Sequence, residues 1–186
     1  AVWVLAGLGD GSFGLPGETP LPISGNGLIS FDLDGNTLED LLVAGSGSTG
    51  GDLALLSSTG MGFFDSPFTF PSGGLEPMAV RVGDLDSGLF PDLVVCNRIS
   101  NQIAVHLGSP GGFSKPLRFG VGALPSDVEL RDLDGDGTLD VAVPNHSEDS
   151  VSVLLGNGDG TFRSDVPFDA FGGPQELVIG DLDFFK

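Results

Sequence analysis

The sequence contains few of the residue types on which many functional sites depend, with one cysteine, two histidines, one tryptophan and no tyrosine. The single cysteine, Cys96, excludes a disulfide within the chain and a cysteine-based zinc cluster. Lysine and arginine number seven against 26 acidic residues, so the formal charge is −19. Nucleic acids and anionic membrane surfaces attract basic patches, and we expect neither as a partner. No apolar run approaches the roughly 20 residues that membrane insertion requires.

Glycine, in contrast, is abundant at 31 residues, and it separates short apolar runs from one another. No window of 11–18 residues shows a sustained apolar period of 3.6, so a helix-rich fold is not expected. Pairs such as Asn157-Gly158 and Asp159-Gly160 are typical of hairpin turns. The composition therefore predicts an all-β chain of short strands joined by tight turns.

An acidic motif recurs along the chain at intervals of 48 to 52 residues. It reads DLDGNTLED at 32–40, DLDSGLFPD at 84–92 and DLDGDGTLD at 132–140, and it begins again as DLDFFK at 181–186. We call the first three copies the first, second and third aspartate loops. An apolar segment precedes each loop and two follow it, the second ending in a glycine-rich turn and a phenylalanine. This period predicts propeller blades, each with the loop between its first and second strands.

The loop DxDGDGxxD, the strand after it and the turn LLGNGDGTF resemble the FG-GAP/VCBS repeat of integrin-α-type β-propellers. The resemblance implies an all-β propeller of four-stranded antiparallel blades. Counting strands, including a last one at Glu176–Gly180, gives about 3.75 blades, whereas such propellers have about seven. We therefore expect part of a larger ring, or a homo-oligomer that completes one. The single propeller region, 1–186, divides into approximate units 1–27, 28–75, 76–124, 125–173 and 174–186, the first and last being partial.

The aspartate loops have the composition of calcium sites, because calcium takes six to eight oxygen ligands and a short loop supplies them from alternate positions. The third loop offers Asp132, Asp134, Asp136, the Thr138 carbonyl and Asp140. The first loop offers Asp32, Asp34, Asn36, the Leu38 carbonyl and Asp40. We predict that both bind Ca²⁺, with a structural role.

The second loop is less complete, because Gly88 provides no side chain at the fifth position. It offers Asp84, Asp86, the Phe90 carbonyl and Asp92. We predict a weaker third calcium site here, and an Asx turn without metal is an equally good interpretation. The fourth copy has only Asp181 and Asp183, and we predict no site there.

For function, the resemblance implies a secreted or cell-surface module that binds a protein or glycan ligand through rim loops. Candidate contact loops are Gly45–Gly51, Asn97–Asn101 and Asn145–Ser150. The alternative is that each loop is only a solvent-exposed connection between strands. The last contains the glycosylation sequon Asn145-His146-Ser147. One alternative is a lectin, although a chain with one tryptophan and no tyrosine has few of the aromatic side chains on which sugars usually stack. Another is a non-catalytic accessory part of a secreted hydrolase or lyase. We do not expect an enzyme, because His106 lies in an apolar strand and neither G-x-S-x-G nor H-E-x-x-H occurs.

Overall fold

The computed structural model describes residues 1–48 and 50–180, so the fourth aspartate motif, which begins at Asp181, lies outside the described residues. The regular elements within these ranges are all β-strands. No helix that is long and apolar enough to cross a membrane was found among the described residues.

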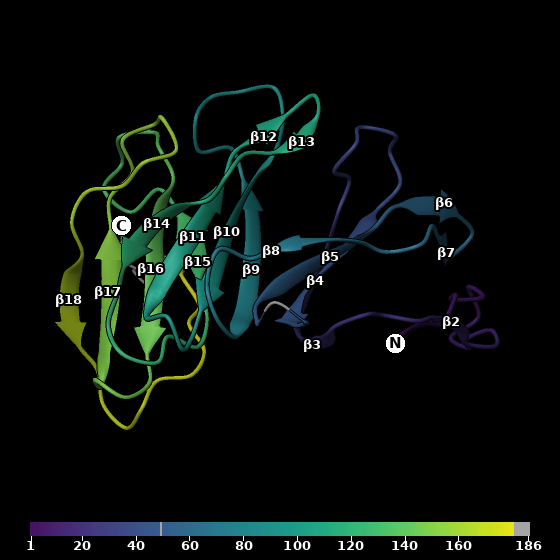
Figure 1. Ribbon diagram of the computed structural model, residues 1–186, viewed down its shortest axis with the longest axis horizontal. Helices are drawn as coiled ribbons and strands as arrows, with labels where there is room; N and C mark the ends of the chain where they lie inside the picture. The colour runs from purple at the N-terminus through teal and green to yellow at the C-terminus, as the bar shows by residue number, and fades with distance from the viewer. Residues whose placement is uncertain (49, 181–186) are drawn as a thin grey trace.

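Three four-stranded antiparallel sheets follow one another along the chain, and we call them the first, second and third blades. The first blade consists of β3 (Ser24–Phe31), β4 (Asp40–Ser46), β5 (Asp52–Leu56) and β8 (Phe68–Pro71). The second consists of β9 (Pro77–Gly83), β10 (Asp92–Asn97), β11 (Gln102–His106) and β14 (Leu117–Gly120). The third consists of β15 (Glu129–Arg131), β16 (Asp140–Asn145), β17 (Ser150–Leu154) and β18 (Val166–Asp169). The third blade lies at the left of Figure 1, followed by the second and the first.

Smaller two-stranded pieces complete the described fold. Near the N-terminus, β1 (Val2–Val4) pairs with β2 (Gly17–Thr19). Short hairpins follow the third strands of the first two blades, formed by β6 (Ser58–Gly60) with β7 (Phe63–Phe64) and by β12 (Gly108–Ser109) with β13 (Gly112–Phe113). A single bridge between Gly156 and Phe162 takes this place in the third blade. The recurrent phenylalanine therefore closes the glycine-rich turn of each blade.

The predicted fold class is confirmed: the chain is all-β, with four-stranded antiparallel sheets of the kind that form propeller blades. The prediction of a strand at Glu176–Gly180 is wrong, because residues 174–180 form no strand. A strand exists only through hydrogen bonds to a neighbour, and no described segment pairs with these residues.

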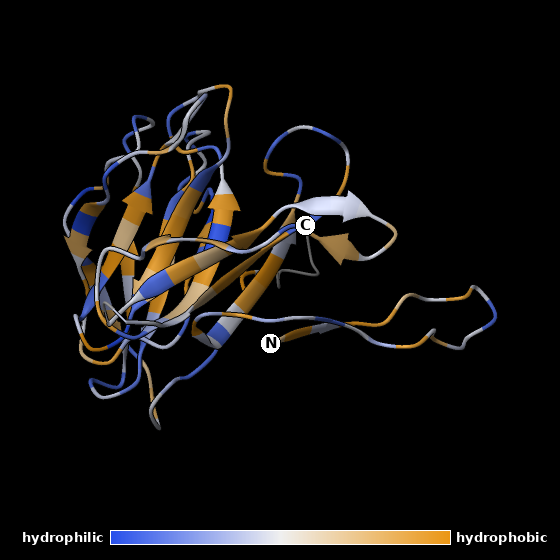
Figure 2. Ribbon diagram, turned by 45° about the vertical axis from the view of Figure 1, so that its right-hand side comes forward, coloured by the Kyte–Doolittle hydropathy of each residue, from blue (hydrophilic) through white to orange (hydrophobic). Residues whose placement is uncertain are grey.

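The core lies between the blades, because residues of the middle strands face alternate neighbours. In β10, Val94 and Cys96 belong to a buried cluster shared with the third blade, whereas Leu93 and Val95 belong to one shared with the first. All six residues of β10 are buried, and so are all six of β16. Burial on both faces explains why these strands are apolar between their first aspartate and last asparagine and do not alternate. Figure 2 shows this as hydrophobic colour concentrated in the strands and polar colour in the loops at their ends.

An ion pair between blades adds to this packing. Arg81 of β9 donates from Nη2 to Glu129 Oε1 of β15 at 2.7 Å and to Asp127 Oδ1 at 3.1 Å. Burial acts against the charge of Arg81, but the hydrogen bonds and charges of Glu129 and Asp127 outweigh it and raise the arginine pKa.

Replacing this arginine should therefore weaken the junction between the second and third blades. We expect Arg81→Met to lower the free energy of unfolding by about 1–2 kcal/mol, between the values typical of exposed and buried pairs. Urea unfolding measures the loss, which should shrink in high salt. The control is Arg98→Met, since Arg98 lies 3.7 Å from Glu76 and both side chains are about one-third exposed. Equal losses in the two variants would contradict the role of Arg81.

A buried histidine lies at the end of β11. The His106 side chain is 1% exposed, and its Nε2 lies 3.1 Å from the Ser72 carbonyl oxygen. Burial lowers the pKa of His106 below its ordinary value, so the imidazole is neutral in the folded protein. His106 is therefore a core residue whose Nε2 has a hydrogen-bond partner.

This histidine should make stability depend on pH. The unfolded chain binds a proton at His106 near pH 6.5, whereas the folded chain does not. The free energy of unfolding is therefore unaffected by His106 above that pH and decreases as the pH falls from 6.5 toward the pKa of His106 in the folded protein. Leucine occupies the corresponding positions 56 and 154. We expect the stability of His106→Leu relative to the wild type to increase from pH 7 to pH 5 in urea titrations. A difference that stays constant over this range would contradict the assignment.

Candidate metal centres

Each aspartate loop ends on a buried aspartate that begins the second strand of its blade, namely Asp40, Asp92 or Asp140. Asp140 Oδ2 accepts a hydrogen bond from the Leu133 amide at 2.7 Å, and its Oδ1 accepts one from the Gly156 amide at 2.8 Å. Asp40 and Asp92 accept the corresponding bonds from Leu33 and Ser58 and from Leu85 and Gly108, all at 2.8–3.0 Å. The last aspartate therefore ties its loop to the turn after the third strand.

The first aspartate of a loop curls the backbone around its own carboxylate. Asp132 accepts hydrogen bonds from the Gly135 amide at 2.7 Å and from the Gly137 amide at 3.0 Å. Both glycines have positive φ, 81° and 90°, which this tight curvature requires. In the first loop Thr37 takes the place of Gly137 with φ 72°, a conformation that costs a β-branched residue free energy.

These turns bring carboxylate oxygens together in three groups, each with one ligand atom per residue and all of these atoms within 4.8 Å of one another. The groups are Asp32, Asp34 and Asp40; Asp84, Asp86 and Asp92; and Asp132, Asp134 and Asp136. The second loop gathers its aspartates as the first does, although it lacks a side chain at the fifth position. In the third loop the fifth-position aspartate completes the group, in place of the last one.

Crowding of carboxylates affects their protonation. Burial raises the pKa of Asp92; its amide hydrogen bonds act in the opposite direction, and the charges of Asp86 and Asp84 raise it further. Asp136 lies in the open part of its loop, where hydrogen bonds from the Thr138 hydroxyl and amide lower its pKa. The pKa values of these two loop aspartates are therefore shifted in opposite directions, by burial in Asp92 and by hydrogen bonds in Asp136.

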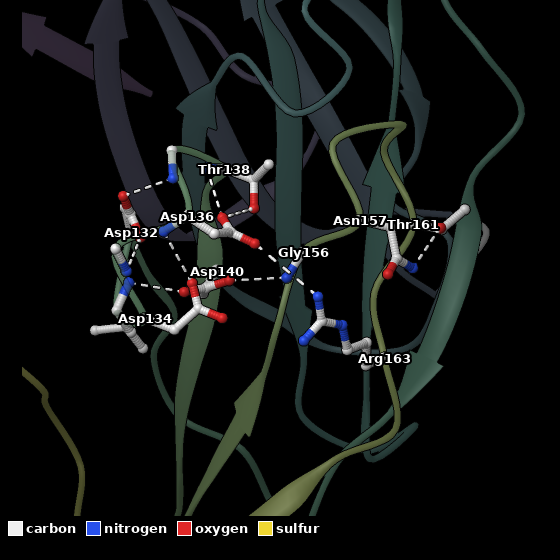
Figure 3. Close-up of polar contacts among 12 residues, drawn as sticks. Asp132, Asp134, Asp136, Thr138, Asp140, Gly156, Asn157, Thr161 and Arg163 are labelled. Carbon is white, nitrogen blue, oxygen red and sulfur yellow. Dashed lines mark hydrogen bonds and ion pairs between the residues drawn. The ribbon is translucent and has the colours of Figure 1, made fainter.

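A cation from the neighbouring hairpin approaches the third loop. Arg163 Nη2 lies 3.9 Å from Asp136 Oδ2, and Figure 3 shows its guanidinium pointing toward the aspartates. Neither this arginine nor the Gly156 amide that binds Asp140 belongs to the repeated aspartate pattern in the sequence. The hairpin begins 16 residues after the aspartate, and only the return of the third strand to the loop brings the two together.

The donor set of these loops fits a hard divalent cation. Every side chain in the three groups offers carboxylate oxygen, the ligand type that calcium and magnesium prefer. In the first loop Asn36 Oδ1 accepts a hydrogen bond from the Leu38 amide at 2.7 Å, so this predicted ligand oxygen has a backbone donor. The predicted carbonyl ligands, from Leu38, Phe90 and Thr138, lie in the same three loops and stay predictions.

The repeated four-stranded sheets and the acidic loop at the same place in each blade define a propeller-type module. A family model described as an FG-GAP-like repeat matches residues 132–184, from the start of the third aspartate loop. The resemblance to an FG-GAP-like repeat seen in the sequence is therefore confirmed over this segment, which covers less than half of the chain. No curated protein matches the chain.

Proposed function

We propose that this chain is a calcium-stabilised propeller module of a secreted or cell-surface protein, which binds a protein or glycan ligand. The observation that carries the proposal is the recurrence of three carboxylate groups, each with its ligand atoms within 4.8 Å, at one position of successive blades. Three like charges at this separation repel one another strongly unless a cation or water compensates them. Calcium is favoured over magnesium because loops that offer many oxygens suit its larger, less regular shell.

The calcium would hold the loops in place without taking part in a reaction. In the third loop, Asp132, Asp134 and Asp136 would supply oxygens, while Asp140 ties the loop to Gly156. A bound cation would neutralise the charge that the backbone amides compensate only in part. One rim of the blades would thereby become more rigid.

Direct titration with calcium tests the metal proposal. We expect calorimetry to give two to three ions per chain, with Asp34→Asn and Asp134→Asn each removing one. Asp159→Asn is the control, because Asp159 is an exposed turn aspartate that accepts hydrogen bonds from Thr161 and lies outside the loops. No binding at millimolar calcium, or a stoichiometry that neither variant changes, would contradict the proposal.

The ligand would contact the opposite rim, where the turns between second and third strands lie. In an antiparallel blade these turns are at the far end of the second strand from the aspartate loop. The polar residues exposed in two of these turns are Asn101, Ser147, Glu148 and Asp149. Glycan and extracellular-protein arrays in calcium test this part of the proposal: binding that polar-to-alanine changes in these turns abolish would support it. Binding that survives such changes would place the ligand elsewhere.

A further inference from the structure

An apolar pocket of about 430 Å³ lies between the first and second blades. Its walls come from β8 and its neighbours on one side, and from the β12–β13 hairpin and the segment after it on the other. The residues that matter for the argument are Phe68, Phe70, His106, Phe113, Lys115 and Pro116. The volume falls within the range of small-molecule sites, about 300–1,000 Å³, which are mostly apolar with a few polar groups.

Aromatic side chains organise the pocket around Phe70. The Phe70 ring stacks on Phe68 with centroids 5.9 Å apart and on Phe113 at 5.5 Å, and His106 meets its edge at 5.9 Å. Phe68 is 65% exposed, so one end of this stack faces solvent. A flat apolar group that covered Phe68 would extend the stack and remove its surface from water.

A departure from the repeat opens the space beside this stack. In the second blade, the residue after β11 is Leu107, whose side chain packs against Gly160 of the third-blade hairpin. The corresponding residue after β5 is Ser57, which is shorter. Ser57 lines a second hollow of about 270 Å³, which shares Leu55, Gly112 and Phe113 with the pocket. The junction of the first and second blades therefore lacks the apolar side chain that packs into the next junction.

The positive charge beside the pocket favours a ligand that carries a negative charge. Lys115 lines the pocket and is exposed, and in the described part of the chain it has no ion-pair partner. His106 is held neutral by burial, and its Nε2 is engaged by the Ser72 carbonyl. Lys115 is the one Lys, Arg, Asp or Glu among the lining residues of the pocket, so it attracts an anion there, against the overall charge of −19.

We propose that this pocket binds a small aromatic carboxylate, with its ring on the phenylalanine stack and its carboxylate beside Lys115. The site is separate from the aspartate loops of the proposed function and does not depend on calcium there. A neutral ligand of the same shape would keep the stacking and lose the ion pair. A cationic one would meet repulsion from Lys115.

The probes are 2-naphthoate, the isosteric neutral 2-naphthamide and the cationic 2-naphthylmethylamine, titrated against the whole chain by ligand-observed NMR and calorimetry. We expect 2-naphthoate to bind most tightly. Lys115→Gln should weaken its binding about 2–5-fold, the range for an exposed ion pair, and leave 2-naphthamide unchanged. Phe68→Ala should weaken both about 3–10-fold. Phe68 is exposed, so this variant keeps the core intact.

Matched controls remove the same groups elsewhere. Arg131→Gln removes an equal charge from β15, and Phe168→Ala removes a phenylalanine that is 55% exposed on β18. Both should bind 2-naphthoate as the wild type does. The proposal is overturned if 2-naphthoate does not bind at millimolar concentration, if the amine binds as tightly, or if the controls weaken binding as much as Lys115→Gln and Phe68→Ala.

Discussion

Replacing Asp140 by alanine should destabilise the protein more than any other single change considered for the loops. Asp140 is fully buried, and each of its oxygens accepts a backbone hydrogen bond, from Leu133 and from Gly156. Alanine would leave two amide donors without their acceptor, and an unpaired buried donor costs about 1–3 kcal/mol. We expect Asp140→Ala to lower the free energy of unfolding by about 3 kcal/mol in chelator, measured by urea denaturation.

The conservative variant and a surface control separate this effect from a loss of charge or of metal. Asp140→Asn keeps one acceptor oxygen, so it should lose less stability than the alanine variant. Asp159→Ala also removes a carboxylate that accepts a backbone hydrogen bond, but Asp159 is exposed and water replaces it. A loss for Asp140→Ala no larger than that for Asp159→Ala would contradict the role of the buried aspartate.

A second large effect is expected at Gly27, where the first strands of two blades approach each other. A Cβ on Gly27 of β3 would lie 2.5 Å from the Met78 carbonyl oxygen and 3.3 Å from the Ala79 Cα of β9. Nearby, Asn26 Nδ2 donates to the Pro77 carbonyl at 3.0 Å. Because backbone blocks the added methyl, Gly27→Ala must push the blades apart, and we expect a loss of about 2–3 kcal/mol in urea unfolding.

Gly120 in β14 is the matched control for this prediction. It is also a strand glycine, and a Cβ there would meet nothing within 4 Å. Gly120→Ala should therefore unfold at nearly the same urea concentration as the wild type. If the two variants unfold together, the close approach of β3 and β9 does not contribute to stability.

Much of the fold follows from the sequence because short apolar runs and a recurring aspartate motif can both be seen along the chain. The apolar runs that were expected to be second strands are β4, β10 and β16, each starting at the last aspartate of its loop. The period of the aspartate motif predicted the sheets, since each copy marks the same turn. The strand predicted at 176–180 does not form. Its apolar residues are typical of a strand, but a strand also needs a neighbouring segment to pair with.

The candidate sites depended more on contacts between distant residues. The alternation of aspartates predicted that carboxylates would gather in the loops, and the structure brings three together in each of the first three loops, without Asp140 in the third. The pattern of aspartates did not predict that Arg163 approaches Asp136. It also did not predict that Ser57 lines a hollow at one blade junction, whereas Leu107 packs against Gly160 at the next. Such contacts join a loop to a hairpin, or one blade to the next. The residue pattern within one repeat does not indicate which distant residues will meet.

The most direct test of the calcium proposal compares thermal unfolding in calcium and in chelator. At 100 times its dissociation constant, an ion that binds only the folded chain adds about 2.7 kcal/mol of stability. For a chain of this size, one such site should raise the unfolding midpoint by roughly 5–10 °C. We predict that rise in millimolar calcium, and its loss in the Asp34→Asn, Asp134→Asn double variant. Identical midpoints of the wild type in calcium and in chelator would contradict the account.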